Sequence, residues 1–251
     1  MNALSRIAQK LRDVSAYRGY ACDVCGAEIF EYPKKRLCVR CAEALALNND
    51  LTCVKCGRKT VTEGVCLSCK AHLPLFTRGV SPLVYRSETA AIVNRVKNGN
   101  RRLAYFLGEE MAAAFLRSQS KRDQGKRWLI VPVPMTEEKR LARGYNQAED
   151  LAHAIALCLQ KAGVDVAEDY ELLQKLRENE GQKHLSTIER AKNVVGSFHV
   201  HKRKQTKCAN VLLVDDIMTT GATGSECARV LFAAGAAEVV FLTAAALPER
   251  K

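Results

Sequence analysis

The chain has 251 residues, of which 47% are hydrophobic and 26% are charged. This composition is typical of a folded protein with one large domain or two unequal ones, and it excludes an intrinsically disordered chain. There are 39 lysine and arginine residues against 27 acidic residues, and the formal net charge of +12 favours polyanionic partners. Aromatic residues make up only 6%, which excludes a dense stacking platform for nucleic-acid bases.

Eleven cysteines are the most unusual feature of the composition, and eight of them form Cys-x-x-Cys pairs. The pairs are Cys22/Cys25, Cys38/Cys41, Cys53/Cys56 and Cys66/Cys69. In a reducing compartment such pairs hold metal, and four thiolates in a tetrahedron suit Zn²⁺. We therefore predict two structural Zn²⁺ ions with closed coordination shells and no hydrolytic role. The scattered Cys158, Cys208 and Cys227 are predicted to be small buried hydrophobic residues.

The pairing of these cysteines is indicated by the residues that follow them. Spacers of 12, 11 and 9 residues separate successive pairs, which is the length of a hairpin that returns one pair to another. Gly26 and Gly57 follow the first and third pairs, where a positive φ turns backbone amides towards the thiolates. Two sequential ribbons are therefore favoured, with the first four and the last four cysteines as the two ligand sets. A cross-braced pairing, first with third and second with fourth, stays open.

Hydrophobic periodicity divides the chain into three parts. Residues 1–20 predict a basic amphipathic helix, residues 21–73 a double zinc ribbon, and residues 74–251 an α/β domain. Within the last part, strands are predicted over 80–85, 128–133, 211–214 and 239–246, and helices over 88–97, 102–117, 147–161 and 223–234. Strands that alternate with helices in this way predict a parallel sheet flanked by helices.

The segment from 211 to 223 carries the strongest functional signal. Four apolar residues are followed by Asp215 and Asp216 and then by a loop of small and hydroxyl-bearing residues, namely Thr219, Thr220, Gly221, Ala222 and Thr223. A Thr-x-x-Glu spacing from 223 to 226 predicts a capping box at the start of the next helix. The free amides and the helix dipole would then form an anion cradle, and the two aspartates would accept hydrogen bonds from a sugar diol.

Two basic segments are expected at the same edge of the sheet. Lys139, Arg140 and Arg143 follow the proline-rich strand end at 131–134, and Gly144 would act as a hinge. Lys97, Arg101 and Arg102 follow the predicted helix over 88–97. Both segments are candidate anion-binding and nucleic-acid-binding sites, and a solvated basic loop is the alternative for each.

The 211–223 segment resembles the fingerprint of the type I phosphoribosyltransferases, and the chain over 22–246 is similar to the ComF competence family. The motifs that carry the second resemblance are the cysteine pairs, residues 97–104, 131–134 and 140–148, Gln182 with Leu185, and Arg190 with Asn193. Asn98 departs from the pattern, since family members often carry an aromatic residue there.

The resemblance implies a phosphoribosyltransferase-type sheet joined to an N-terminal zinc ribbon. It implies a loop that grips the phosphate and ribose of phosphoribosyl pyrophosphate with Mg²⁺, and it assigns Arg140 and Arg143 to the pyrophosphate. It also implies a role in natural transformation, in which the protein handles single-stranded DNA beside a DNA helicase or translocase.

Three classes of function remain. The first is a competence-type factor that binds and helps to internalise or process single-stranded DNA. The second is an active phosphoribosyltransferase with an unidentified acceptor base, for which no catalytic residue is assigned. The third is a zinc-ribbon adaptor with a scaffold domain. No apolar signal region is visible in 1–20, and Gly235 and Glu238 interrupt the most apolar stretch. We therefore expect no membrane span and a cytoplasmic location, at the inner face of the membrane where partners recruit the protein.

Overall fold

The computed structural model describes residues 21–31, 35–49, 51–176, 194–201 and 203–249. The helix predicted over 1–20 lies outside the described residues, and so do Gln182, Leu185, Arg190 and Asn193.

A parallel sheet forms the centre of the molecule. Its strands are β1 (Arg78–Val80), β2 (Leu83–Val84), β3 (Trp128–Pro132), β4 (Val166–Glu168), β7 (Asn210–Met218) and β8 (Glu238–Ala246). They run in the order β1-β8-β7-β3-β4, with β2 also paired to β8, and every pairing is parallel. This sheet confirms the predicted α/β fold. The short strands β5 (Leu173–Lys175) and β6 (Phe198–Val200) form a separate antiparallel pair.

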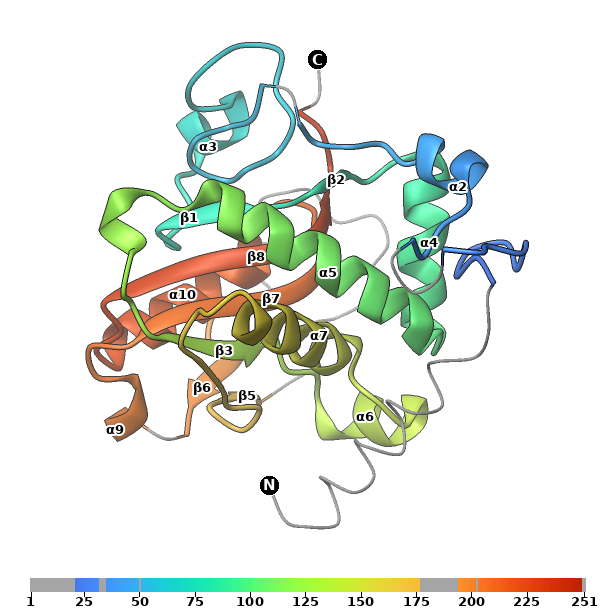
Figure 1. Cartoon of the computed structure of the whole chain (residues 1–251). Helices are drawn as coiled ribbons and strands as arrows, with labels where there is room; N and C mark the ends of the chain where they lie inside the picture. The colour runs from blue at the N-terminus through green and yellow to red at the C-terminus, as the bar shows by residue number, and fades with distance from the viewer. Residues whose placement is uncertain (1–20, 32–34, 50, 177–193, 202, 250–251) are drawn as a thin grey trace.

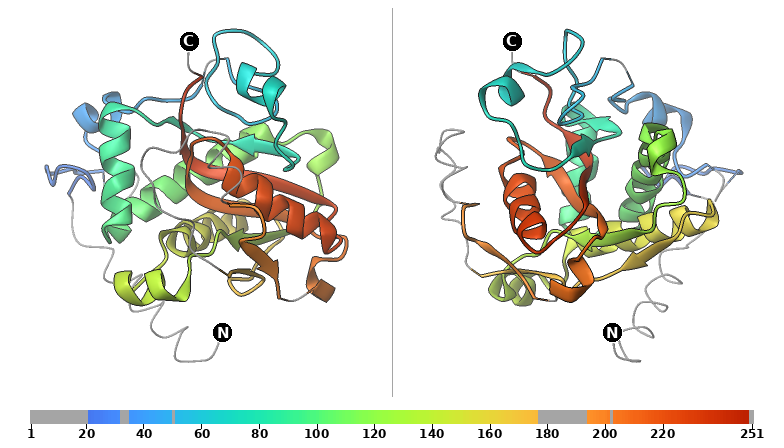
Figure 2. Two further views of the ribbon diagram at one scale, coloured as in Figure 1. Left: turned by 180° about the vertical axis from the view of Figure 1, so that it is seen from behind. Right: turned by 90° about the vertical axis from the view of Figure 1, so that its left-hand side faces the viewer.

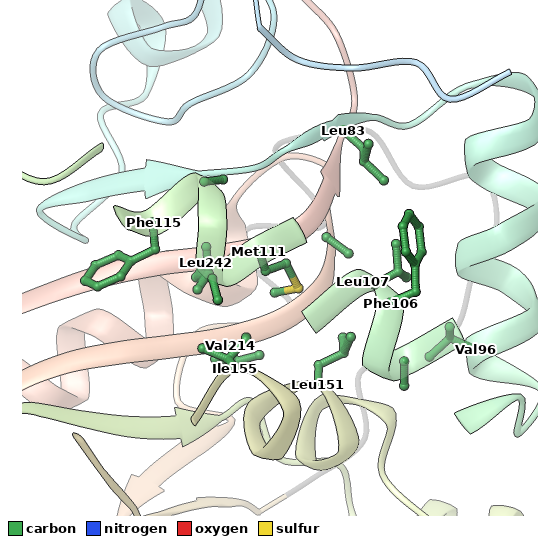
Figure 3. Packing of buried hydrophobic residues seen from close by; sticks show 14 of the residues in the cluster. Leu83, Val96, Phe106, Leu107, Met111, Phe115, Leu151, Ile155, Val214 and Leu242 are labelled. Carbon is green, nitrogen blue, oxygen red and sulfur yellow. The ribbon is translucent and has the colours of Figure 1, made fainter. Parts of the chain in front are cut away.

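Helices cover both faces of the sheet (Figures 1 and 2). The helices α4 (Ser87–Lys97), α5 (Arg101–Ser118) and α7 (Gln147–Lys161) lie on one side, and α10 (Ala222–Ala233) lies on the other. The alternation of side chains along β7 fills both layers. Leu212 and Val214 join the cluster under α5 and α7, which Figure 3 shows with Met111 and Ile155 at its centre. The neighbouring residues 211 and 213 belong to the cluster under α10.

The described residues also contain five short helical elements. They are α2 (Val39–Glu43), α3 (Leu67–Ala71), α6 (Glu137–Arg143), α9 (Arg203–Thr206) and the 3₁₀ turn η1 (Lys121–Asp123).

The two cysteine-rich segments pack against different parts of the body (Figure 1). The first carries α2 and lies against α4 and α5, where Arg95 donates to the Val24 carbonyl at 2.6 Å. The second carries α3 and lies beside β1 and the end of β8. There the Gly79 amide donates to the Lys55 carbonyl at 2.8 Å, and the residue 249 amide to the Lys59 carbonyl at 3.0 Å.

Several predicted elements differ from the structure. The strand predicted over 80–85 is split into β1 and β2 because Pro82 has no amide to donate to the ladder. The basic loop predicted around 139–143 is the helix α6, whose end is capped by Gly144 in the left-handed region. Cys208 is exposed and Cys158 half-buried, so the prediction of a buried residue is right only for Cys227.

The start of α10 also differs from the prediction. Gly221, with φ +81°, is the N-cap, and Thr223 already lies inside the first turn. The Glu226 carboxylate is turned away from the helix start, where it accepts from the Gly196 amide at 2.8 Å and pairs with Arg229 at 2.7 Å. The predicted capping box is therefore wrong, because these partners from outside the first turn hold the glutamate.

Gly57→Ala should strongly destabilise the second cysteine-rich segment. Gly57 has φ +71°, and an added Cβ would lie 2.4 Å from the Gly79 carbonyl oxygen, a backbone atom that cannot swing away. We expect a loss of about 2 kcal/mol or more in the free energy of unfolding, measured by denaturant or thermal unfolding.

Gly26→Ala is the matched control for this substitution. Gly26 has φ +77°, but an added Cβ would meet nothing within 4 Å. It should therefore show only the cost of a left-handed alanine, about 1 kcal/mol. Equal losses in the two variants would contradict the close approach of Gly57 to β1.

Candidate functional site

The eight paired cysteines come together as two groups of four. One group holds Cys22, Cys25, Cys38 and Cys41, and the other holds Cys53, Cys56, Cys66 and Cys69. In each group the sulfur atoms all lie within 4.8 Å of one another. The structure thus has the sequential arrangement and not the cross-braced one. Gly26 and Gly57 take the positive φ expected of the two knuckles.

The geometry of both groups fits a tetrahedral ion. Zinc–sulfur bonds of about 2.3 Å place neighbouring sulfurs about 3.8 Å apart in a tetrahedron. The Cys25 and Cys38 sulfurs are 3.6 Å apart, and those of Cys56 and Cys66 are 3.7 Å apart. Backbone amides at 38 and 66 donate to the sulfurs of the first cysteine in their own groups, both at 3.3 Å. The two groups could therefore hold metal ions such as zinc.

Local hydrogen bonds favour the thiolate form that a metal needs. The Ala27 amide lowers the pKa of Cys25 to about 6, with help from the Cys38 thiol. A hydrogen bond with Cys69, followed by the amide and charge of Arg58, lowers the pKa of Cys56 to about 5. Each group thus has one thiol whose pKa is lowered, whereas burial raises the pKa of Cys41 and Cys66 in the same groups.

Buried arginines beside the cysteine groups were missed by the sequence analysis. Arg36 pairs with Asp23 at 3.3 Å and with Glu109 at 2.6 Å, which ties the first group to α5. The Arg58 guanidinium donates to the Cys56 sulfur at 3.2 Å and to the Thr219 carbonyl at 3.0 Å. One sequence signal could have identified these buried arginines. Each lies two residues from a paired cysteine, in a segment with few apolar residues.

The predicted phosphate loop connects β7 to α10, at the carboxyl end of the central strand. Thr219 is exposed, Thr220 is half-buried, and the Thr220 hydroxyl accepts from the Ala222 amide at 3.3 Å. An α-helix leaves the amides of its first turn without intrahelical partners, here those of Thr223 and its neighbours. Amides of this kind bind anions at helix starts, and phosphate binding by this loop stays a prediction.

The two aspartates lie within β7, which continues to Met218 instead of ending at residue 214. Strand alternation turns their side chains to opposite faces of the sheet. Asp216 contacts Lys97 of α4 and Gln147 of α7. Burial, and then the negative charge of Asp215, raise the pKa of Cys227 of α10, so Asp215 is on the α10 side. Burial, and then the negative charge of Asp216, raise the pKa of Asp215 well above its usual range. Asp215 therefore holds a proton more readily than an isolated carboxylate would.

A chain of polar contacts joins Asp216 of β7 to the basic segments predicted to lie near the loop. Lys97 pairs with Asp216 at 3.4 Å, and the Gln147 amide donates to the same carboxylate at 3.2 Å. Arg143 in turn donates to Gln147 at 2.7 Å. The Tyr145 hydroxyl donates to the Lys97 carbonyl, which fixes the end of α4. Residues from α4 and α7 thus meet at one carboxylate of β7, and α6 is joined to them through Gln147.

Three of the remaining basic candidates, Arg101, Arg102 and Arg140, pair with acidic residues outside the phosphate loop. Arg140 lies on the exposed helix α6 and approaches Glu149 at 3.8 Å, and Lys139 lies on the same helix. Arg101 pairs with Asp150 at 3.4 Å. Arg102 is turned to the first cysteine group, where it pairs with Asp23 at 2.8 Å. Arg102 is therefore directed away from the phosphate loop.

A recess beside α6 was not predicted from the sequence. It has a volume of about 300 Å³ and lies between the residues after β3 and the strand β5. Met135, Arg140, Asn146, Tyr170 and Lys175 are among its lining residues. No helix in the described part of the chain is long and apolar enough to cross a membrane.

The chain is similar to proteins connected with DNA, although no family model matches it. It is 26% identical over 215 residues to the competence protein ComFC of Bacillus subtilis (strain 168), which covers 83% of this chain and 82% of that protein. It is 29% identical over 212 residues to the DNA utilization protein YhgH of Salmonella typhimurium, with 81% and 87% covered.

Solved structures give a more distant likeness. The glutamine phosphoribosylpyrophosphate amidotransferase from B. subtilis, complexed with ADP and GMP, matches 56% of this chain and 26% of its own at 19% identity and a TM-score of 0.33. The L. donovani hypoxanthine-guanine phosphoribosyl transferase matches 56% and 71% at 14% identity and a TM-score of 0.32.

The fold is therefore described by the strand order of the parallel sheet. The likeness to ComFC and YhgH rests on sequence similarity. The similarity extends over about four fifths of the chain, and it is accompanied by the two four-cysteine groups. The chain is therefore similar in sequence to the ComFC and YhgH proteins of competence and DNA utilization.

Proposed function

We propose that the protein binds single-stranded DNA and helps to internalise or process it during natural transformation. The observation that carries this proposal is the contact chain from Arg143 through Gln147 and Asp216 to Lys97. It brings basic segments from distant parts of the sequence to Asp216, on the strand that leads into the proposed anion-binding loop. A nucleic-acid strand is a repeat of sugar and phosphate, so one such loop flanked by cations suits its backbone.

The exposed helix α6 supports this proposal. Lys139, Arg140 and Arg143 lie on it, and it packs beside the start of α7. The names of the relatives point the same way, since they refer to competence and DNA utilization. Because no base-reading element accompanies these cations in the described residues and aromatic residues are few, binding should depend on the backbone and show little sequence preference.

Metal ions have separate roles in this proposal. The two four-cysteine groups would each hold a structural Zn²⁺, which leaves no open coordination position for hydrolysis. Mg²⁺ would accompany a bound phosphoribosyl pyrophosphate, with Asp215 and Asp216 for the sugar hydroxyls, Arg140 and Arg143 for the pyrophosphate, and Thr219 to Thr223 around the phosphate. We propose residues 21–73 as a double ribbon and 74–251 as the sugar-phosphate domain. The partner would be a DNA helicase or translocase at the inner face of the membrane.

Arg140→Ala combined with Arg143→Ala should weaken binding to single strands of every sequence. Each lost phosphate contact should reduce the slope of log K against log salt by about 0.7, so the double variant should flatten the slope by about 1.4. Fluorescence anisotropy with a labelled oligonucleotide at several salt concentrations measures both quantities on metal-replete protein.

A double variant at the opposite edge of the sheet is the control. Arg122 and Arg127 are exposed and precede β3, and replacing both with alanine removes the same charge. This control should leave the salt slope unchanged. If the wild-type protein does not bind at low salt, the DNA proposal fails for the isolated chain.

An active phosphoribosyltransferase is the second candidate. The observation that favours it is the recess beside Arg140, which is large enough for a base. A transferase would release pyrophosphate from phosphoribosyl pyrophosphate with one particular base and would bind DNA negligibly. Partner binding without either activity would instead indicate an adaptor.

A further inference from the structure

The second cysteine group and the phosphate loop share one buried side chain. Arg58 is 6% exposed and follows the knuckle of the second group. Its Nε donates to the Cys56 sulfur at 3.2 Å, and its Nη2 donates to the Thr219 carbonyl at 3.0 Å. The two residues of the second contact are 161 positions apart in the chain. One rigid guanidinium therefore joins a predicted metal ligand to the first residue of the loop.

Other contacts hold the same segment against the loop and leave it little freedom. Phe76 is fully buried, and its ring lies beside Gly221, where an added Cβ would be 3.7 Å away. The Lys55 ammonium donates to the Phe76 and Thr77 carbonyls. A knuckle fixed in this way presents the Arg58 fork in one direction, as a bidentate donor requires.

The first cysteine group has different partners. Its buried arginine, Arg36, is 5% exposed and is directed to Asp23 and to Glu109 of α5. The described contacts of this group thus run to α4 and α5. The two four-cysteine groups have the same set of ligands but different arginine contacts. Arg36 pairs with carboxylates, whereas Arg58 donates to a cysteine sulfur and to the Thr219 carbonyl.

We propose that Arg58 is a positioning residue that makes the second cysteine group a part of the sugar-phosphate site. The cluster sulfur fixes one side of the guanidinium, and the other side fixes the Thr219 carbonyl, which sets the direction of the loop amides. A metal held by the second group therefore determines the shape of the loop, whereas a metal in the first group does not. The inference rests on the proposed binding of a sugar phosphate by this loop.

Hydrogen exchange of the loop tests the coupling without any ligand. In Arg58→Met, which keeps an apolar stem but loses every donor, amides over 217–226 should exchange about tenfold faster, as expected for the loss of a charged hydrogen bond. Arg58→Lys keeps the charge beside the cluster, but one ammonium cannot span both partners, so it should also speed exchange. Elemental analysis should still find two zinc ions per chain in the lysine variant.

Arg36→Met is the control, since it removes a buried arginine from beside the other group. It should leave exchange over 217–226 unchanged even where it lowers the melting temperature. Loop exchange at the wild-type rate in Arg58→Lys with both zinc ions bound would overturn the inference. Equal acceleration in Arg36→Met would overturn it as well, because the effect would then be general destabilisation.

Ligand binding separates this inference from the function on which it rests. The Kd for phosphoribosyl pyrophosphate with Mg²⁺ should rise about tenfold in Arg58→Lys and stay at the wild-type value in Arg36→Met. By linkage, saturating ligand should raise the zinc affinity of one of the two sites, measured by equilibrium competition with a chelator. If the wild type binds no sugar phosphate while loop exchange still responds to Arg58, the proposed function fails and the coupling stands.

Discussion

Cys66→Ser should remove one of two zinc ions from the protein and lower its melting temperature by roughly 10 °C. Residues 51–73 contain few large buried side chains besides the cysteines, so the metal supplies most of the stability of this segment. A loss of about 4 kcal/mol corresponds to a shift of this size for a chain of 251 residues. Elemental analysis gives the metal content, and thermal unfolding gives the stability.

Two variants make this result specific. Cys38→Ser should remove the other zinc ion and leave the second group intact, because the two sets of sulfurs are separate. Cys208→Ser changes an exposed thiol outside both groups and should alter neither the zinc content nor the melting temperature. A wild-type protein that is folded over 21–73 and holds less than about one zinc ion would contradict the structural role of the metal.

Phosphoribosyl pyrophosphate with Mg²⁺ should raise the melting temperature of the wild-type protein by about 5–10 °C at a hundredfold excess over Kd. Replacing Asp215 and Asp216 together with alanine should abolish this shift. The physical reason is that diol recognition and the anchor for Lys97 and Gln147 are lost together, while the loop amides alone remain. A thermal-shift titration measures the effect.

Asp165→Ala is the matched control for these carboxylates. Asp165 is exposed at the opposite edge of the sheet, and its carboxylate makes a long pair with Arg127 at 3.7 Å, so its removal should not change the ligand-induced shift. Asp216→Asn preserves the shape of the side chain, which separates loss of charge from loss of folding. A wild-type protein with no shift at millimolar ligand would mean that the loop has no sugar-phosphate function.

Patterns that are local in the chain could be predicted from the sequence. The helix α7 begins and ends at the predicted residues, because its apolar stripe and the Asn146 cap are contained in the segment itself. The strands β3 and β8 differ from the prediction by one residue, since each is a short apolar run. Within the cysteine segment, the glycine after every other pair was enough to indicate the sequential ligand sets.

Boundaries that depend on a neighbouring strand or helix could not be predicted in this way. The strand β7 extends past Asp215 because β8 continues to pair with it, and a register between strands is absent from either segment alone. The helix α10 starts at Ala222 because Gly221 turns the chain there, while Glu226 is held by Gly196 and Arg229. Tertiary partners decided these points.

The sequence by itself determined the cysteine pairs, the loop that follows the apolar run at 211–214 and the basic segments. Each of these patterns lies within a few consecutive positions of the chain. Only the tertiary structure decided which of them meet. It turned Arg102 to Asp23, placed Lys97 and Gln147 on Asp216, and joined Arg58 to Thr219. The physical reason is that burying a charge without a partner costs free energy. The partners are residues that tertiary packing brings close, and these can be far apart in the sequence.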